Sequence, residues 1–150
     1  MLERVYAVDG YYDGPEVGYA DYRGLPHRFE VDDEWETEES RVRIFKLYRI
    51  SNEHLCVVLE AHLLWARWNE KYRRGELRET LPGEKDERVL PEDREAYEFL
   101  TDRQAKFVEM ERGEYVLLQG DFVPGGIETE YKAFCETSLV KWQEASGRVA

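Results

Sequence analysis

The order of its segment types is what most constrains this chain: short strand-like segments flank two long helix-like segments. The first helix-like segment spans about residues 52–74, after Ser51, whose hydroxyl suits an N-cap, and before Gly75, a helix stop. The second spans about residues 91–113 and starts at Pro91, which suits a first helical position. The rest of the chain is therefore expected to form strands around an inserted helical pair.

Turn signals divide the remaining segments into strands. Asp-Gly-Pro at residues 13–15 and Arg-Gly-Leu-Pro at residues 23–26 are typical of tight connections. The expected strands are residues 4–9, 17–22, 27–31, 41–50 and 115–123, with a last one within 131–142. This order, ββββααββ, predicts an α+β fold: a curled antiparallel sheet or partial barrel with the helix pair packed on one face. The last strands are expected to return and pair with the first.

A length of 150 residues predicts a single domain, residues 1–150, with a core that needs no metal or disulfide. Its parts would be a strand region (1–50), a helical pair (51–113), C-terminal strands (114–143) and a short tail. Cys56 lies in an apolar run and is expected to be a small buried residue.

Charge is the informative part of the composition. The chain has 33 acidic and 21 basic residues, a net charge of −12, which disfavours nucleic-acid binding and favours association with a basic protein partner. No basic leader precedes an apolar run, and no apolar stretch is long enough to span a membrane. We expect a cytoplasmic protein; nothing in the sequence indicates an oligomeric state.

Motifs that carry chemistry are missing. His54 and His62 are too far apart along the expected helix to share an ion, and no paired-cysteine ligand motif occurs, so no metal site is expected. His62 is expected to be a core histidine. The sequence has no nucleophile elbow and no phosphate-binding glycine motif. No motif therefore predicts a catalytic residue or a cofactor.

The sharpest local feature is the acidic stretch of residues 30–39, in which seven of ten residues are carboxylates. It is expected to be an exposed loop, with Trp35 either folded into the core or available as an interface anchor. Basic residues follow it directly and are expected to pair with part of its charge across strands. The expected partner-binding residues are Asp32, Asp33, Glu34, Trp35, Glu36, Glu38 and Glu39.

Three functional readings follow. The first is a protein-binding module, of the immunity or inhibitor type, that recognises a basic partner. The second is a small-ligand-binding protein or hydrolase whose cleft uses Asp13, Asp21, His27 and Glu30 with nearby tyrosines. The third is a structural component of a bacterial assembly, with strand edges that add to a neighbouring sheet.

The first thirty residues also carry a resemblance. The string Asp-Gly-Tyr-Tyr-Asp-Gly-Pro at residues 9–15, Gly-Tyr-Ala at 18–20 and Gly-Leu-Pro-His-Arg-Phe-Glu at 24–30 resemble the opening of a family of bacterial proteins with no established activity. Trp-Ala-Arg-Trp at 65–68 and Arg-Gly-Glu-Tyr at 112–115 are similar to later landmarks of that family. The resemblance implies a bacterial, single-domain protein and assigns no functional residue.

Overall fold

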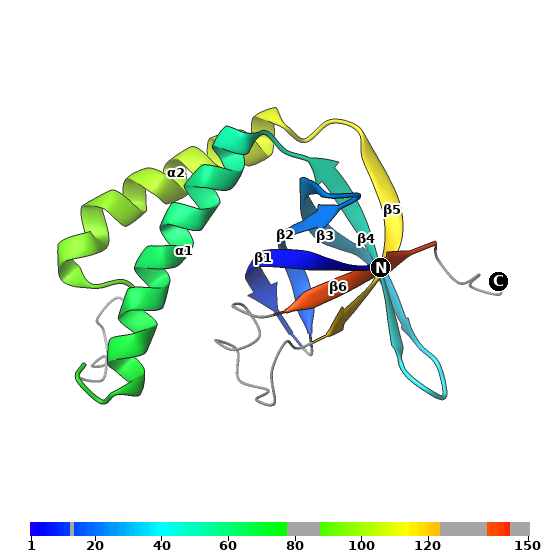
Figure 1. Cartoon of the computed structure of the whole chain (residues 1–150), viewed down its shortest axis with the longest axis horizontal. Helices are drawn as coiled ribbons and strands as arrows, with labels where there is room; N and C mark the ends of the chain where they lie inside the picture. Colours follow the sequence, from blue (N-terminus) through cyan, green and yellow to red (C-terminus); the bar gives the residue numbers. More distant parts are fainter. Residues whose placement is uncertain (13, 78–87, 124–137, 145–150) are drawn as a thin grey trace. The chain divides into compact units, whose positions relative to one another are not determined.

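A computed structural model describes residues 1–12, 14–77, 88–123 and 138–144 of the chain. The chain divides into two compact units, one formed by Met1–Asn52 with Glu109–Ala150 and the other by Glu53–Val108. The strands belong to the first unit, and nearly all of the helical pair belongs to the second (Figure 1).

The strands form a closed antiparallel barrel in the order β1-β2-β3-β4-β5-β6. Closure comes from β6, which pairs with β1 through Leu2↔Lys141 and with β5 through Gln119↔Gln143. The α+β class, the expected element order and the return of the last strands are confirmed, and the curled sheet closes fully where a partial barrel was expected. The strand bounds are β1 Leu2–Tyr11, β2 Pro15–Tyr22, β3 Leu25–Glu36, β4 Arg41–Arg49, β5 Tyr115–Val123 and β6 Leu139–Gln143.

Gly120 lies where β5 changes its pairing partner from β4 to β6. Pairing of β5 with β4 ends at Ile44↔Gln119, and from there β5 pairs only with β6 among the described strands. A Cβ at Gly120 would lie 2.6 Å from the Trp142 ring and 3.1 Å from the Phe45 ring. Glycine is therefore needed where the strand changes partner, because a side chain would displace the core rings.

Aromatic side chains fill the barrel. Phe29, Phe45, Phe122 and Trp142 are in mutual contact, with ring centroids 5.2–5.9 Å apart. Their edge-to-face and tilted arrangements are the favourable ones for aromatic pairs. Aliphatic residues of the remaining strands complete this core. A barrel of this size is filled by its own side chains, so binding sites are expected on its outer wall, edges and loops.

The tight turn predicted at Arg23-Gly24 is confirmed by its backbone geometry. Arg23 and Gly24 both have positive φ, 54° and 75°, as the two central residues of a type I′ hairpin turn require, and Tyr22 pairs with Leu25 across that turn. Residues 27–31 fall within β3, but this strand continues to Glu36, so the prediction of a loop is wrong for the acidic stretch up to Glu36, and only residues 37–39 lie in an exposed turn.

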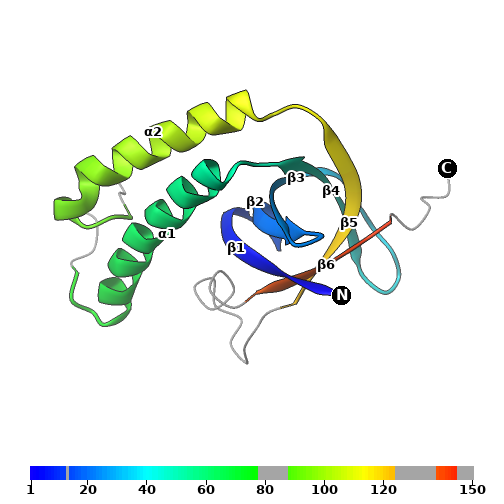
Figure 2. The ribbon, with the colours of Figure 1, turned by 45° about the horizontal axis from the view of Figure 1, so that its top comes forward.

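The helices are α1 (Asn52–Arg73) and α2 (Arg94–Met110), which follows a single 3₁₀ turn at Pro91–Asp93. The stop at Gly75 is confirmed: Gly75 has φ 72°, its N–H donates to Tyr72 O, and the N–H of Glu76 donates to Lys71 O, the Schellman pattern. The two helices run side by side (Figure 2), and Val57, Ala61 and Leu100 form their shared buried cluster.

The buried face of α1 does not contain Cys56 and His62, which were both expected in the core. The buried residues are His54, Val57, Val58 and Ala61, whereas Cys56 is exposed, so the prediction of a buried Cys56 is wrong. His62 is only partly buried and stacks on Trp65, while the fully buried histidine is His54, which stacks on Phe107. Apolar residues surround much of this helix, which leaves its periodicity ambiguous.

Candidate functional site

The acidic stretch lies on a hairpin arm that projects from the barrel (Figure 1). The arm consists of Asp33–Glu36 of β3, the turn 37–40 and Arg41–Arg43 of β4. Within the described strands, this part of β4 pairs with β3 alone, because β5 leaves β4 at Ile44. A register shift between Val31 and Asp33 leaves Asp32 as the bulged residue at the base of the arm. A bulge sharpens the bend and twist of a strand, which suits the point where the arm leaves the barrel.

Cross-strand ion pairs neutralise much of the acidic stretch. Glu34 and Arg43 are register partners with Oε2 and Nε 2.9 Å apart, and Glu36 and Arg41 are register partners with Oε1 and Nη2 3.1 Å apart. At the base of the arm, Asp32 lies 3.5 Å from Lys46. The expectation that the following basic residues pair with the acidic ones is confirmed for these three. Arg49 instead donates to the backbone carbonyls of Pro26 and Ile50.

Arg43 anchors the arm. Its side chain is only 8% exposed, and besides Glu34 it donates to the carbonyl oxygens of Tyr12 and Pro15. A buried guanidinium with three partners holds the β1–β2 turn against the arm. Gly14 makes this possible, because it has φ 123° and a Cβ there would lie 3.0 Å from Arg43 Nη1.

The tip of the arm is a turn organised by Thr37. Its hydroxyl donates to Ser40 O (2.9 Å) and accepts from the backbone N–H groups of Glu39 (3.3 Å) and Ser40 (3.0 Å). Glu38 and Glu39 sit on this turn and are exposed.

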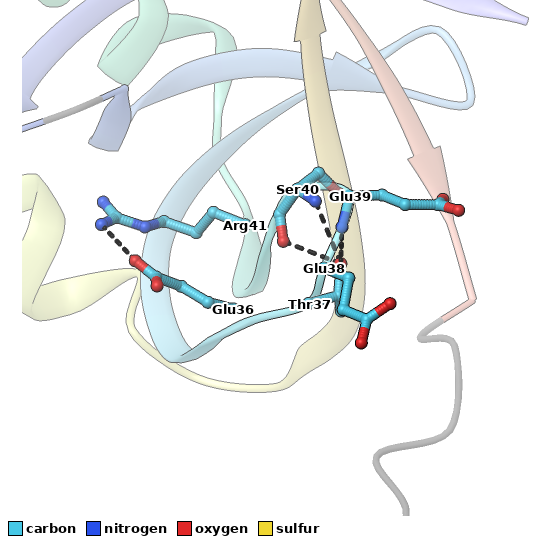
Figure 3. A pocket seen from close by; sticks show the side chains of 6 residues that line it. All are labelled: Glu36, Thr37, Glu38, Glu39, Ser40 and Arg41. Atoms are coloured by element: carbon cyan, nitrogen blue, oxygen red, sulfur yellow. Dashed lines mark hydrogen bonds and ion pairs between the residues drawn. The ribbon is translucent and has the colours of Figure 1, made fainter.

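An open hollow of about 400 Å³ lies at the tip. Figure 3 shows the carboxylates of Glu38 and Glu39 directed away from the Glu36–Arg41 pair. Among the described residues, no cation lies within ion-pair distance of Glu38 or Glu39. The hollow is lined by Glu36, Thr37, Glu38, Glu39, Ser40 and Arg41.

Trp35 and Asp33 occupy the other face of the arm. Trp35 is partly buried opposite Val42 and does not belong to the aromatic core of the barrel. Asp33 accepts the backbone N–H of Glu34 at 2.9 Å. Trp35 therefore lies outside the aromatic core and is neither fully buried nor fully exposed.

The second set of candidate residues does not converge. Asp21 accepts a 2.8 Å hydrogen bond from the Tyr6 hydroxyl on the outer face of β2. Burial, followed by this hydrogen bond, raises the pKa of Tyr6, so Tyr6 remains a donor to Asp21. Glu30, on the outer face of β3, is separated from Asp21 by four register steps, roughly 13 Å along the strands. Asp13 lies outside the described residues.

His27 belongs to the opposite face of β3 from Glu30, since it shares the parity of the core residue Phe29. Its Nδ1 lies 2.8 Å from Leu25 O. Burial lowers the pKa of His27 and nearby Arg49 adds to the effect, while the hydrogen bond to Leu25 opposes it. The imidazole is thus held neutral within the end of the barrel, and no cleft shared with Glu30 is formed.

Glu30 forms ion pairs with two arginines. Arg28 Nη1 lies 2.9 Å from one carboxylate oxygen, and Arg112 Nη2 lies 2.9 and 3.0 Å from the two oxygens. A hydrogen bond with Tyr48 and the charge of Glu30 raise the pKa of Arg112. These contacts tie the segment that enters β5 to the wall of β3 and leave Glu30 unsuited to general-base chemistry.

The helical unit carries stacked aromatic pairs on α1. Trp68 stacks on Tyr72 with centroids 5.1 Å apart, and both tryptophans of α1 are partly buried. Over the described ranges, no group of three His, Cys, Asp or Glu side chains is placed to hold a metal ion. Likewise, none of the helices seen there is long and apolar enough to span a membrane.

The strand β5 was predicted from the sequence, but the exposure of its first half was not. Tyr115, Val116 and Leu117 are 47%, 42% and 49% exposed, although all three were expected to belong to an ordinary strand. The sequence does contain a signal for this exposure, because three successive apolar residues on a strand place apolar side chains on both faces.

Comparisons with known proteins identify no similar protein. The resemblance of the first thirty residues to a bacterial family accordingly stays a prediction from the sequence. No family model, no curated protein and no solved structure matches the chain.

Proposed function

We propose that this protein is a cytoplasmic binding module of the immunity or inhibitor type, which recognises a basic protein partner with the tip of its acidic hairpin arm. The observation that carries the proposal is the pair of exposed carboxylates, Glu38 and Glu39, which lack a cation partner among the described residues on an arm that extends past the barrel wall. Exposed charge of one sign accelerates association with an oppositely charged partner.

The construction of the arm supports this role. Its inner carboxylates are paired with Arg41 and Arg43, and Arg43 is tied to the β1–β2 turn. A hairpin held in this way loses little conformational entropy when it binds. The recognition residues are therefore narrowed from the whole acidic stretch to Glu38 and Glu39, with Glu36 and Arg41 as the rim.

The hydrolase alternative has less support. His27 and Glu30 occupy opposite faces of β3, and Asp21 and Glu30 are each engaged by structural partners. A catalytic base and its partners have to reach the same reacting atoms, which this arrangement does not provide.

The test is a parallel affinity capture from bacterial lysate at low and high salt, with three baits. They are the wild-type chain, a tip variant with Glu38→Lys and Glu39→Lys, and a matched control with Glu98→Lys and Asp102→Lys on the exposed side of α2. Both variants change the net charge by the same amount. We expect the wild type and the control to retain the same basic protein at low salt, and the tip variant to lose it.

Two results contradict the proposal. Equal behaviour of the tip variant and the control, whether both retain or both lose the partner, would mean that the tip carboxylates have no specific role, and retention of no basic protein by the wild type would remove the partner altogether. Circular dichroism of the tip variant checks that its fold is intact, which is expected because the tip side chains are exposed.

A further inference from the structure

The first half of β5 is an open sheet edge. Residues 115–118 pair with β4, from Tyr48↔Tyr115 to Phe45↔Leu118, but the ladder with β6 begins only at Gln119↔Gln143. Within the described part of the chain, the side of residues 115–118 that faces away from β4 has no strand partner. A strand edge of this kind presents backbone N–H and C=O groups that can pair with another strand.

The edge is apolar on both faces. Tyr115 and Leu117 project from the outer face and Val116 from the inner face, and each is more than 40% exposed. Natural edge strands usually carry charged side chains or proline, which discourage pairing. An apolar open edge therefore marks a docking position for an extended segment.

A glutamate lies at each end of this edge. Glu114 directly precedes Tyr115, and Glu144 directly follows the Gln143 that pairs with Gln119. Both glutamates are exposed, and the strand assignment of β6 stops before Glu144. The open edge is thus an apolar centre with a carboxylate at each end, roughly 13 Å apart along the strand.

We propose that the first half of β5 docks an extended segment of the partner, added as a β-strand, with apolar residues in its middle and Lys or Arg at each end. The proposal rests on the proposed function in one respect, namely that the partner is basic. Backbone hydrogen bonds to residues 115–118 supply the pairing, Tyr115 and Leu117 contact the apolar middle, and Glu114 and Glu144 select the basic ends.

A second copy of this chain fits the edge less well. In an antiparallel pairing of two β5 strands centred on Val116, Glu114 of one copy lies opposite Leu118 of the other, beside its Glu144. Like charges would meet at both ends of the pair, and each copy also carries a net charge of −12.

The test uses amide chemical shifts of the full ¹⁵N-labelled chain with two synthetic capped peptides, Lys-Thr-Val-Thr-Val-Lys and Glu-Thr-Val-Thr-Val-Glu. We expect the lysine peptide to shift the amides of residues 114–118 and 143–144, with an affinity about fivefold higher than that of the glutamate peptide. A variant with Glu114→Lys and Glu144→Lys should reverse this preference. Both side chains are exposed, so the barrel is expected to tolerate the change.

Other outcomes overturn the proposal. They include the absence of shifts at β5 with either peptide, shifts at the hairpin tip alone, and binding that requires deletion of residues 145–150, which would assign the edge to the chain's own end. Sedimentation that shows a dimer through β5 would assign the edge to a second copy instead.

The failures of the two proposals are distinguishable. The tip variant with Glu38→Lys and Glu39→Lys should keep the peptide shifts at β5, because those residues lie at the far end of β4 from Tyr115. Loss of partner capture with retained peptide binding would isolate the role of the tip. Retained capture with no peptide binding would overturn the edge alone.

Discussion

Single side chains join segments of this barrel that are distant in sequence. Arg43 reaches Glu34, Tyr12 O and Pro15 O, and so connects the arm with the β1–β2 turn. Arg41, two residues earlier on the same strand, forms an ion pair with Glu36, and its side chain is 32% exposed. The two arginines look equivalent in the sequence, yet their burial predicts very different contributions to stability.

Replacement of Arg43 by alanine should lower the free energy of unfolding by about 2–4 kcal/mol, because two carbonyl groups and a carboxylate lose a buried donor. Arg41→Ala is the matched control and should cost about 0–1 kcal/mol, as expected for an exposed ion pair. Urea unfolding followed by circular dichroism measures both. Equal effects of the two substitutions would show that Arg43 does not anchor the arm.

His27 predicts a pH dependence of stability. Burial holds its folded-state pKa below 6.5, so above pH 6.5 the imidazole is neutral in both states and contributes no pH dependence. As the pH falls from 6.5 toward the lowered folded value, the unfolded chain binds the proton first, and the free energy of unfolding decreases.

The test compares urea unfolding of the wild type and His27→Gln between pH 7.5 and pH 5. The loss of stability on acidification should be smaller in the variant, which has no imidazole to protonate. An identical loss in both proteins would show that burial does not perturb the pKa of His27.

At the scale of the elements, two glycines on β2 and β5 decide how closely strands approach. Gly120 lets β5 pass over the Trp142 and Phe45 rings. At Gly18, a Cβ would lie 2.3 Å from the Ala7 carbonyl oxygen on β1 and 2.6 Å from the Phe29 ring. Neither glycine stands at a turn, so both are needed for space rather than for positive φ.

Gly18→Ala should destabilise the barrel by ~3 kcal/mol or more, because the contact with Ala7 is to backbone and cannot be relieved by a side-chain rotation. Gly113→Ala is a suitable control, since a Cβ there meets nothing within 4 Å. Its stability should be unchanged or rise by up to ~1 kcal/mol. Thermal unfolding monitored by circular dichroism separates the two, and a stable Gly18→Ala protein would contradict the tight β1–β2 approach.

For the whole molecule, the helical pair is an insertion between neighbouring strands of a closed barrel. The two ends of the insertion meet at the barrel, where the N–H and hydroxyl of Ser51 donate to the Glu111 carboxylate at 3.0–3.1 Å. The barrel has its own core, whereas the helices share a small buried cluster of Val57, Ala61 and Leu100. The barrel is therefore expected to fold independently, and the helical pair is not.

The prediction is that a chain with residues 53–108 replaced by a short Gly-Ser linker retains the barrel. Trp142, packed on the barrel core, and the partly buried Trp35 remain, while Trp65 and Trp68 leave with the insertion. A cooperative unfolding transition with blue-shifted tryptophan emission is the expected result. A non-cooperative transition with solvent-exposed emission would show that the barrel needs the helices.

Local chemistry by itself determined the element order, the Arg23-Gly24 turn, the stop at Gly75 and the bounds of β5. These features depend on nearest neighbours in the chain, such as positive φ at glycine and alternation along a strand. It also determined that the acidic stretch is followed by basic residues able to pair with it. The sequence did not predict that part of this stretch forms a strand. Its charge suggested a loop, whereas cross-strand ion pairs with Arg41 and Arg43 stabilise a strand.

Only the tertiary structure decided the rest. The return of the last strands to the first was expected, but full closure of the barrel depends on β6 pairing with β1 and β5 at once, which no local pattern encodes. His27 and Glu30, three residues apart on one strand, lie on opposite faces in any register, and the tertiary structure decides only which of the two faces the core. The neutralisation of Glu34 and Glu36 but not Glu38 and Glu39 follows from register, because the ladder ends at the turn. Long-range pairing sets these outcomes, since only it determines which side chains become neighbours.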